Sequence, residues 1–429
     1  MSPWHHRLVS RLVWSLLVVA LAVASCGGSD EPASTPSLAG EVDALAPEPA
    51  AEATSAPEPV PTGAPDPTAT AVPTATPAPA LTPIPILGTG PYDVGGQTIT
   101  VIDAERDRTF FVDIWFPLAP GTSGELIEYT FVTGDYFESA RALDVEPTDA
   151  SSDGPFPLVV YSHGSGGLRY LHSDYTETIA SHGYVVAAPD HPGNTAIERV
   201  LGSPADTASI AIDRPLDVIE VLDELLGGRG QAAPFLELID PERIALTGHS
   251  FGGYTAYAVA GGVESAVGGV EPDPRIDALI PLAPAVGDGG DGSLLSSSQL
   301  ASIDQPTLII AGTDDTTTPV DPNVETPWNA SGASPHYRLE LVGAEHQTFT
   351  DLCDYVAVLA DREGANPLVV ETVVTMAEQG CSPDDMPIER ARALTNTFAV
   401  TFLDSVFRDG EMFNPNTHEI PADVIYAVK

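Results

Sequence analysis

Short runs of apolar residues alternate with segments of helical spacing along most of the chain after residue 90. The runs predict strands at 157–162, 184–189, 244–248, 278–283, 307–312 and 337–341, each short and apolar enough to be buried on both faces of a sheet. Helical patterns fall between them, at 174–182, 214–226, 252–260 and 388–407. An antiparallel hairpin, 98–103 with 109–116, precedes them around the charged turn 104–108. The alternation predicts an α/β fold with a mostly parallel central sheet and helices on both faces.

The first 26 residues have the pattern of an export signal. A positive start with Arg7 and Arg11 precedes an apolar run, 12–24, that is too short to span a membrane comfortably. The sequence Val-Ala-Ser-Cys that ends at Cys26 resembles the lipobox of bacterial lipoproteins, in which the cysteine is lipidated. We therefore expect an exported protein held at the cell membrane or cell surface by a lipid on Cys26. An ordinary signal peptide or an N-terminal anchor helix is the alternative.

Residues 27–87 are rich in Pro, Ala, Thr and Glu and contain no aromatic residue, Lys or Arg. Such a composition buries too little apolar surface to offset the entropy lost on ordering, so we expect a disordered linker. The remaining residues, 88–429, are predicted to form one catalytic domain.

The charge of the chain excludes several function classes. Its 429 residues include 17 Lys+Arg and 61 Asp+Glu, which gives a formal net charge of −44. A nucleic-acid partner or electrostatic binding to anionic lipid would need basic clusters, which the chain lacks. Three cysteines are too few for a disulfide framework or a four-cysteine zinc site.

Candidate chemistry centres on Ser250. The sequence Gly248-His-Ser-Phe-Gly-Gly253 follows a predicted strand and precedes a predicted helix. This is the G-x-S-x-G context in which a sharp turn exposes a serine hydroxyl as a nucleophile, and glycines make the tight turn possible. The helix N-terminus adds N–H groups beside the reacting oxygen.

A serine nucleophile needs a histidine base and a carboxylate that orients the histidine. In this fold the chain order is serine, then the acid, then the histidine. Asp315 is the expected acid, with Asp314 as the alternative, because both follow the strand 307–312 at its carboxyl end. His346 is the expected base, because it follows the strand 337–341 at the same edge. His336 precedes that strand and is expected at the opposite edge, and His418 lies in the tail.

Two backbone N–H groups are expected to stabilise the oxyanion. One belongs to Phe251, directly after the nucleophile, and the other to Ser165 in the glycine-rich loop after strand 157–162. His163 and His249 lie beside these residues and are expected to be structural.

Several segments together resemble α/β-hydrolases described as predicted dienelactone hydrolases and platelet-activating factor acetylhydrolases. They are Gly90–Gly95, Asp103–Arg108, Trp115–Pro117, Tyr161–Gly167, Ala180–Thr195, Arg214–Asp217 and Gly248–Thr255. The resemblance implies the α/β-hydrolase fold and a serine esterase, with bacterial cutinase-like polyester hydrolases as more distant relatives. Dienelactone hydrolases use a cysteine nucleophile where this chain has Ser250. The acetylhydrolases place the acid after an earlier strand, whereas the absence of an acid at 278–284 favours Asp315, the cutinase-like position.

These features predict hydrolysis of short-chain, lipid or polyester-type carboxylic esters through an acyl-enzyme, with no cofactor and no metal. A catalytically silent binding lipoprotein and a serine peptidase are the alternatives. Cys353 and Cys381 are expected to pair as a disulfide in an exported protein, and free buried thiols are the other possibility.

Overall fold

The computed structural model describes residues 81–130, 136–265, 268–287, 294–360, 362, 364 and 367–429. The chain divides into two units, Met1–Ala75 and Thr76–Lys429, and every described residue belongs to the second. The expected export signal 1–26, its Cys26 and residues 27–80 of the expected linker lie outside the described residues. No helix within the described ranges is both long and apolar enough to cross a membrane.

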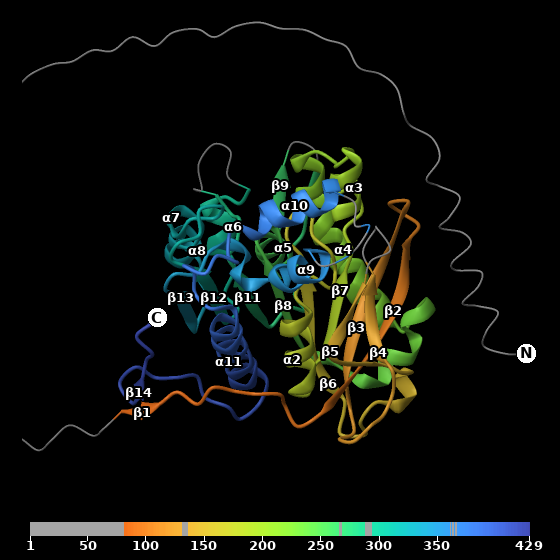
Figure 1. Ribbon diagram of the computed structural model, residues 1–429, viewed down its shortest axis with the longest axis horizontal. Coiled ribbons are helices and arrows are strands. Elements are labelled where there is room, and N and C mark those ends of the chain that lie inside the picture. The colour runs from red at the N-terminus through yellow and green to blue at the C-terminus, as the bar shows by residue number, and fades with distance from the viewer. Residues whose placement is uncertain are drawn as a thin grey trace, which may run out of the picture. The chain divides into compact units, whose positions relative to one another are not determined.

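An eleven-stranded sheet forms the centre of this unit (Figure 1). Its strands lie in the order β15-β13-β12-β11-β8-β6-β7-β3-β2-β5-β4. They are β2 (Asp93–Asp103), β3 (Arg108–Leu118), β4 (Leu126–Thr130), β5 (Tyr136–Asp144), β6 (Phe156–Ser162), β7 (Val185–Pro189), β8 (Ile239–His249), β11 (Ala278–Leu282), β12 (Thr307–Gly312), β13 (His336–Leu341) and β15 (Val424–Val428). The six neighbours from β7 to β13 are parallel, which confirms the predicted sheet. The predicted hairpin is β2–β3, and β3 joins the sheet antiparallel to β7.

Helices cover both faces of the sheet, as the strand–helix alternation predicts. The longer ones are α2 (Ser173–Ser181), α4 (Thr207–Gly227), α5 (Phe251–Gly261), α9 (Leu352–Ala360), α10 (Pro367–Ala377) and α11 (Ile388–Phe407). The shorter elements are α3 (Ala196–Leu201), α6 (Ser297–Ala301), α7 (Val320–Asn323), α8 (Glu325–Ala330), η1 (Pro147–Asp149), η2 (Gly230–Leu238), η3 (His346–Phe349), β1 (Thr82–Pro83), β9 (Val263–Ser265), β10 (Gly268–Val270) and β14 (His418–Glu419).

Strand β6 shows why the sheet needs two layers of helices. Val159 and Tyr161 belong to the core that contains α2 and α11, whereas Leu158 and Val160 belong to the core that contains α4 and α5. Successive strand residues point to opposite faces, so a continuous apolar run is buried on both sides.

Helix α4 begins seven residues earlier than its apolar spacing predicts. The apolar spacing predicts a helix only from Arg214 onward. In the structure Asp206 caps the helix by accepting a hydrogen bond from the Ser209 N–H, and Pro215 lies in its interior. Proline leaves the carbonyl four residues earlier without a helical partner. The Tyr254 hydroxyl of α5 donates to that oxygen, on Ala211, at 2.8 Å.

The folded unit also includes residues that the sequence analysis assigned to the linker. Strand β1 pairs in parallel with β14, and Ile84 is buried. The Leu87 N–H donates to Thr397 Oγ1 of α11 at 3.0 Å. The domain boundary at residue 88 is therefore too late, because these contacts fix the chain from residue 82 onward.

A disulfide joins Cys353 in α9 to Cys381, which follows α10. The expected pairing is therefore formed. It closes a loop with a sequence separation of 28 residues behind the segment that carries His346.

Candidate active site

Ser250 occupies the turn between β8 and α5, in a backbone conformation that non-glycine residues rarely adopt. Its φ and ψ are 57° and −119°. The Ser250 N–H donates to the Leu282 carbonyl at 2.9 Å, and the Ala285 N–H donates to the Ser250 carbonyl at 3.0 Å. These bonds to the end of β11 and the residues after it hold the turn in its strained conformation.

The glycines beside Ser250 are required by close backbone approach. A Cβ on Gly252 would lie 1.8 Å from the Ser162 carbonyl oxygen, and one on Gly248 would lie 2.5 Å from the Gly252 oxygen. Any side chain at either position would therefore force β6, β8 and α5 apart. The predicted strand–turn–helix context of the serine is confirmed.

His346 and Asp315 meet at the carboxyl ends of neighbouring strands. His346 begins η3 after β13, and Asp315 lies in the loop after β12. The distance from His346 Nδ1 to Asp315 Oδ2 is 2.7 Å, with both residues buried. Asp314 points elsewhere: it is exposed, and its Oδ1 accepts from the Thr313 hydroxyl at 2.7 Å. Of the two candidate acids, the structure brings Asp315 to the histidine.

The Asp315 carboxylate is fully engaged by donors. Its Oδ1 accepts from the Thr317 and Thr318 N–H groups at 2.9 and 2.7 Å, and its Oδ2 also lies 2.8 Å from Thr318 Oγ1. Burial alone would raise the pKa of Asp315, but the hydrogen bonds from His346 and Thr318 hold it below its usual value. The carboxylate therefore stays charged, and Thr318 is a supporting residue that the sequence analysis missed.

The glycine-rich loop after β6 packs against the serine. A Cβ on Gly164 would lie 3.4 Å from Ser250 Cβ, so the next residue, Ser165, is close to the turn. Asn194 holds this loop through two hydrogen bonds of 3.1 Å. The Gly166 N–H donates to the Asn194 carbonyl, and Asn194 Nδ2 donates to Ser165 Oγ. The Ser165 N–H has no protein acceptor among the described residues, and Phe251 is the first residue of α5, whose N–H no helical carbonyl can accept.

A fully buried arginine, Arg214, supports this loop. In the sequence it stands out only as part of the family-like segment Arg214–Asp217, with no role assigned. The Arg214 guanidinium donates to Asn194 Oδ1 at 2.7 Å, to Ser162 Oγ at 2.9 Å and to the His163 carbonyl. It also lies 5.1 Å from the centre of the Phe251 ring. Burial lowers the pKa of Arg214 to about 9, so the side chain is still a cation at neutral pH. It places positive charge behind both expected N–H donors.

The two histidines expected to be structural are buried beside the site. His163 Nδ1 contacts the Gly164 carbonyl at 2.7 Å, and burial lowers the pKa of His163 well below its usual value. His249 Nε2 contacts the His346 carbonyl at 2.9 Å. His336 is the first residue of β13 and pairs in register with Thr307, the first residue of β12. It therefore lies at the amino ends of the parallel strands, whereas His346 lies at their carboxyl ends. His418 lies in β14.

A second serine–histidine–aspartate arrangement lies inside the fold. Ser162 Oγ and His191 Nε2 are 2.9 Å apart, and His191 Nδ1 and Asp217 Oδ2 are 3.1 Å apart. Arg108 neutralises Asp217 through two bonds of 2.8 Å. All three members are at most 2% exposed, so no substrate can reach them. Hydrogen-bond geometry alone therefore does not identify an active site, and the two arrangements differ in their serines: Ser250 is half-buried, whereas Ser162 is buried.

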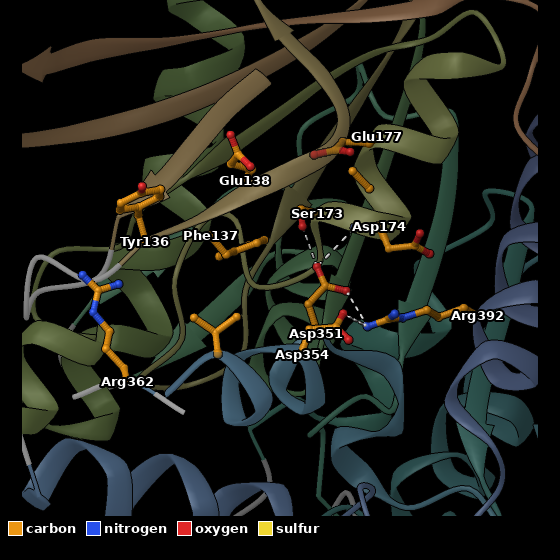
Figure 2. Close-up of a pocket in the computed structure, with 12 residues that line it drawn as sticks. Tyr136, Phe137, Glu138, Ser173, Asp174, Glu177, Asp351, Asp354, Arg362 and Arg392 are labelled. Carbon is orange, nitrogen blue, oxygen red and sulfur yellow. Dashed lines mark hydrogen bonds and ion pairs between the residues drawn. The ribbon is translucent and has the colours of Figure 1, made fainter. Parts of the chain in front are cut away.

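A cavity of about 610 Å³ lies apart from Ser250, between β5, α2, α9 and α11 (Figure 2). Asp351 lines this cavity, accepts a hydrogen bond from Ser173 Oγ at 2.7 Å and forms an ion pair with Arg392 at 3.2 Å. Neither Ser250, Asp315 nor His346 is among its lining residues. Within the described ranges, no group of three or more His, Cys, Asp or Glu side chains is placed to hold a metal ion.

Comparisons with known proteins agree with this architecture. Residues 130–209 match the family described as platelet-activating factor acetylhydrolase, isoform II. This segment contains the glycine-rich loop and ends before Ser250. Chlorophyllase-1 from Arabidopsis thaliana is 30% identical over 139 residues, which cover 31% of this chain and 37% of the relative. The chain thus matches little more than a third of that protein's length.

The fold has a solved counterpart. A ferulic acid esterase from Streptomyces cinnamoneus superposes with a TM-score of 0.58 at 22% sequence identity, covering 81% of this chain and 99% of the other. At that identity the likeness establishes the fold. Together with the strand–turn–helix at Ser250, it shows that the chain has the α/β-hydrolase fold, and residues 130–209 are similar to the platelet-activating factor acetylhydrolase family.

Proposed function

We propose that the protein is a serine carboxylic-ester hydrolase that acts on short-chain, lipid or polyester-type esters through an acyl-enzyme. Ser250 is the nucleophile, His346 the base and Asp315 the orienting acid. The observation that carries the proposal is the buried 2.7 Å contact between His346 Nδ1 and Asp315 Oδ2, at the same sheet edge as the strained Ser250 turn.

The chemistry follows from this arrangement. Because Asp315 accepts from Nδ1–H, the Nε2 atom of His346 carries the lone pair that takes the Ser250 proton. The serine oxygen attacks the ester carbonyl, and the Ser165 and Phe251 N–H groups stabilise the oxyanion. His346 then returns the proton to the leaving alcohol. Water repeats the cycle on the acyl-enzyme, so the chain's own residues supply every proton transfer.

The two alternatives are weaker. A binding protein without catalysis would have no use for a strained serine beside a histidine–aspartate pair. A serine peptidase would use the same groups, but the similar proteins named above are an acetylhydrolase family, a chlorophyllase and a ferulic acid esterase. Their names favour ester over amide substrates.

A series of p-nitrophenyl esters from C2 to C16 tests the proposal, using the full chain in non-ionic detergent and its Ser250→Ala variant. We expect turnover that is lost in the variant, with a chain-length optimum that separates acetyl-type from lipase-like pockets. Cleavage of a peptide p-nitroanilide in place of every ester would favour the peptidase alternative. The absence of turnover on both, by folded protein, would favour the binding protein.

We also propose that lipidated Cys26 holds the enzyme at the membrane, with the Pro-rich segment as a spacer. The lipobox-like sequence supports this. Partition of the wild type into the detergent phase of Triton X-114, with the Cys26→Ala variant in the aqueous phase, is the expected result. Equal partition of both would contradict it.

A further inference from the structure

Arg199 is an exposed arginine that makes no ion pair with any residue that the structure describes, although acids outnumber basic residues by 61 to 17 in the chain. Arg108, Arg275 and Arg390, for example, each bind one or more carboxylates. Within the described part of the chain, the guanidinium of Arg199 makes one weak hydrogen bond, from Nη1 to the Ser165 carbonyl at 3.4 Å. An unpaired cation in so acidic a protein is a position at which an external anion can bind.

Helix α3 places this side chain along the loop beside Ser250. The Ala196 N–H donates to the Gly167 carbonyl at 2.9 Å, which fixes the start of α3 on the loop. A Cβ on Gly166 would lie 2.9 Å from Arg199 Cδ, so the arginine stem packs against the loop backbone. The guanidinium is thus held near Ser165 by packing, with its charge left unused.

The neighbouring carboxylate does not neutralise Arg199. Glu198 Oε2 accepts from the Thr195 N–H at 3.0 Å, and Glu198 Oε1 accepts from the Gly193 N–H at 3.1 Å, as part of the cap of α3. Partial burial raises the pKa of Glu198, but a bond from the Thr195 hydroxyl together with these backbone bonds holds the pKa below its usual value and turns the charge toward the cap.

The position of Arg199 relates it to the proposed chemistry. Its guanidinium contacts the carbonyl of Ser165, whose N–H is the proposed oxyanion donor, and the adjacent Gly164 packs against Ser250. An ester whose carbonyl faces that N–H therefore has its substituents near Arg199.

We propose that Arg199 forms an anion subsite at the mouth of the active site, and that the enzyme prefers esters carrying a carboxylate or phosphate group close to the ester bond. The inference rests on the proposed function. A guanidinium offers paired N–H donors that match the oxygens of either anion. Without it, the net charge of −44 would repel such substrates.

Matched esters measure the preference. On the acyl side, mono-p-nitrophenyl succinate is compared with p-nitrophenyl pentanoate. On the alcohol side, 4-acetoxybenzoate and 4-acetoxyphenyl phosphate are compared with methyl 4-acetoxybenzoate. The full chain, Arg199→Gln and Arg199→Lys are assayed with Arg229→Gln, an exposed arginine that precedes β8 at the opposite sheet edge, as the control.

We expect Arg199→Gln to lower the anionic-to-neutral ratio of kcat/KM about tenfold, the low end for a hydrogen bond to a charged group, on at least one side of the ester. The neutral ester should change less than threefold, and Arg199→Lys should retain part of the preference. Added salt should lower the wild-type ratio. If the ratio falls only for acyl-side or only for alcohol-side esters, the anion binds on that side of the ester bond. If it falls only for the phosphate ester or only for the carboxylate esters, that group is the preferred anion. An unchanged ratio, or a parallel loss on charged and neutral esters, would overturn the subsite.

Direct binding separates this inference from the esterase proposal. Calorimetric titration of the Ser250→Ala full chain with glutarate and with inorganic phosphate should show binding of at least one anion that Arg199→Gln weakens and Arg229→Gln does not. Arg199-dependent binding without ester turnover would overturn the esterase and leave the subsite standing. Ester turnover with no Arg199-dependent binding or selectivity would overturn the anion subsite and leave the esterase proposal standing.

Discussion

His249 Nε2 lies 2.9 Å from the main-chain oxygen of His346, and the two imidazole rings are 4.5 Å apart. Because a carbonyl can only accept, Nε2 must carry the proton. The residue directly before the proposed nucleophile therefore holds the backbone of the proposed base. This contact joins the turn at the end of β8 to the loop after β13.

His249 should be a positioning residue. Burial, followed by the nearby His346, lowers the pKa of His249 to about 3, so it remains a neutral donor throughout the working pH range. We expect His249→Ala to lower kcat by up to about 10²-fold with little change in KM, because a small displacement of the base is costly. His249→Gln, which can keep an N–H donor, should recover much of the loss. A lower Tm with normal kcat in both variants would show a purely structural role.

The neighbouring aspartates provide a matched pair of variants. Asp315→Asn should lower kcat on the order of 10⁴-fold, because an amide no longer selects the histidine tautomer with a free Nε2. Asp314→Asn should leave kcat within about twofold, because the Asp314 side chain is exposed and, among the described residues, bonds only to the Thr313 hydroxyl. Steady-state kinetics on one p-nitrophenyl ester measure both. Equal losses, or a larger loss in Asp314→Asn, would reverse the assignment of the acid.

Arg214 should matter for oxyanion stabilisation, because it holds the loop through Asn194 and the His163 carbonyl. Arg214→Lys retains the charge but not the fork of donors, and we expect a loss of about 10- to 100-fold in kcat. The loss should be smaller for a thionoester, whose sulfur accepts hydrogen bonds poorly. Equal losses on ester and thionoester would indicate that Arg214 acts on stability alone.

Asp351, in the cavity of Figure 2, should make stability depend on pH. Burial raises the pKa of Asp351 to about 7, although Arg392 and Ser173 act against the shift. The unfolded chain releases the same proton near pH 3.9, so the folded state binds more protons between about pH 4 and 7 and is destabilised as the pH rises through that window.

The free energy of unfolding of Asp351→Asn relative to wild type measures this effect. The difference should rise by about 1.4 kcal/mol per pH unit between about pH 4 and 7 and level off above. Urea unfolding at several pH values gives the difference. A difference that does not change with pH would show that Asp351 is ionised throughout.

The sequence predicts the bounds of largely buried elements accurately. Strand β12 and helix α11 begin and end where their apolar patterns predict, because burial leaves a continuous run in one and a regular spacing in the other. Strands β4 and β5, at the edge of the sheet, were not predicted, since their exposed residues break the pattern. The first two turns of α4 were missed because Pro215 lies inside the helix, and the Ala211 carbonyl that it leaves unpaired is satisfied by the Tyr254 hydroxyl, a tertiary contact without local signal.

At the candidate site, the sequence alone placed Ser250 and His346 by their position after strands. It favours Asp315 but keeps Asp314 as the alternative, because both share one loop and the turn at Thr317 and Thr318 decides which carboxylate points inward. The segment Arg214–Asp217 belongs to the family-like pattern, but the role of Arg214 could not be predicted, because an arginine in a helical pattern is usually solvated. The full burial that reveals it is a property of the packed structure.

The most direct test of the account is labelling of the full chain with a fluorophosphonate, followed by intact-mass and peptide analysis. We predict one adduct per chain, on Ser250, with no adduct in Ser250→Ala and slower labelling in Asp315→Asn. No adduct on folded wild-type protein, or an adduct that persists in Ser250→Ala, would contradict the assignment of Ser250 as the nucleophile.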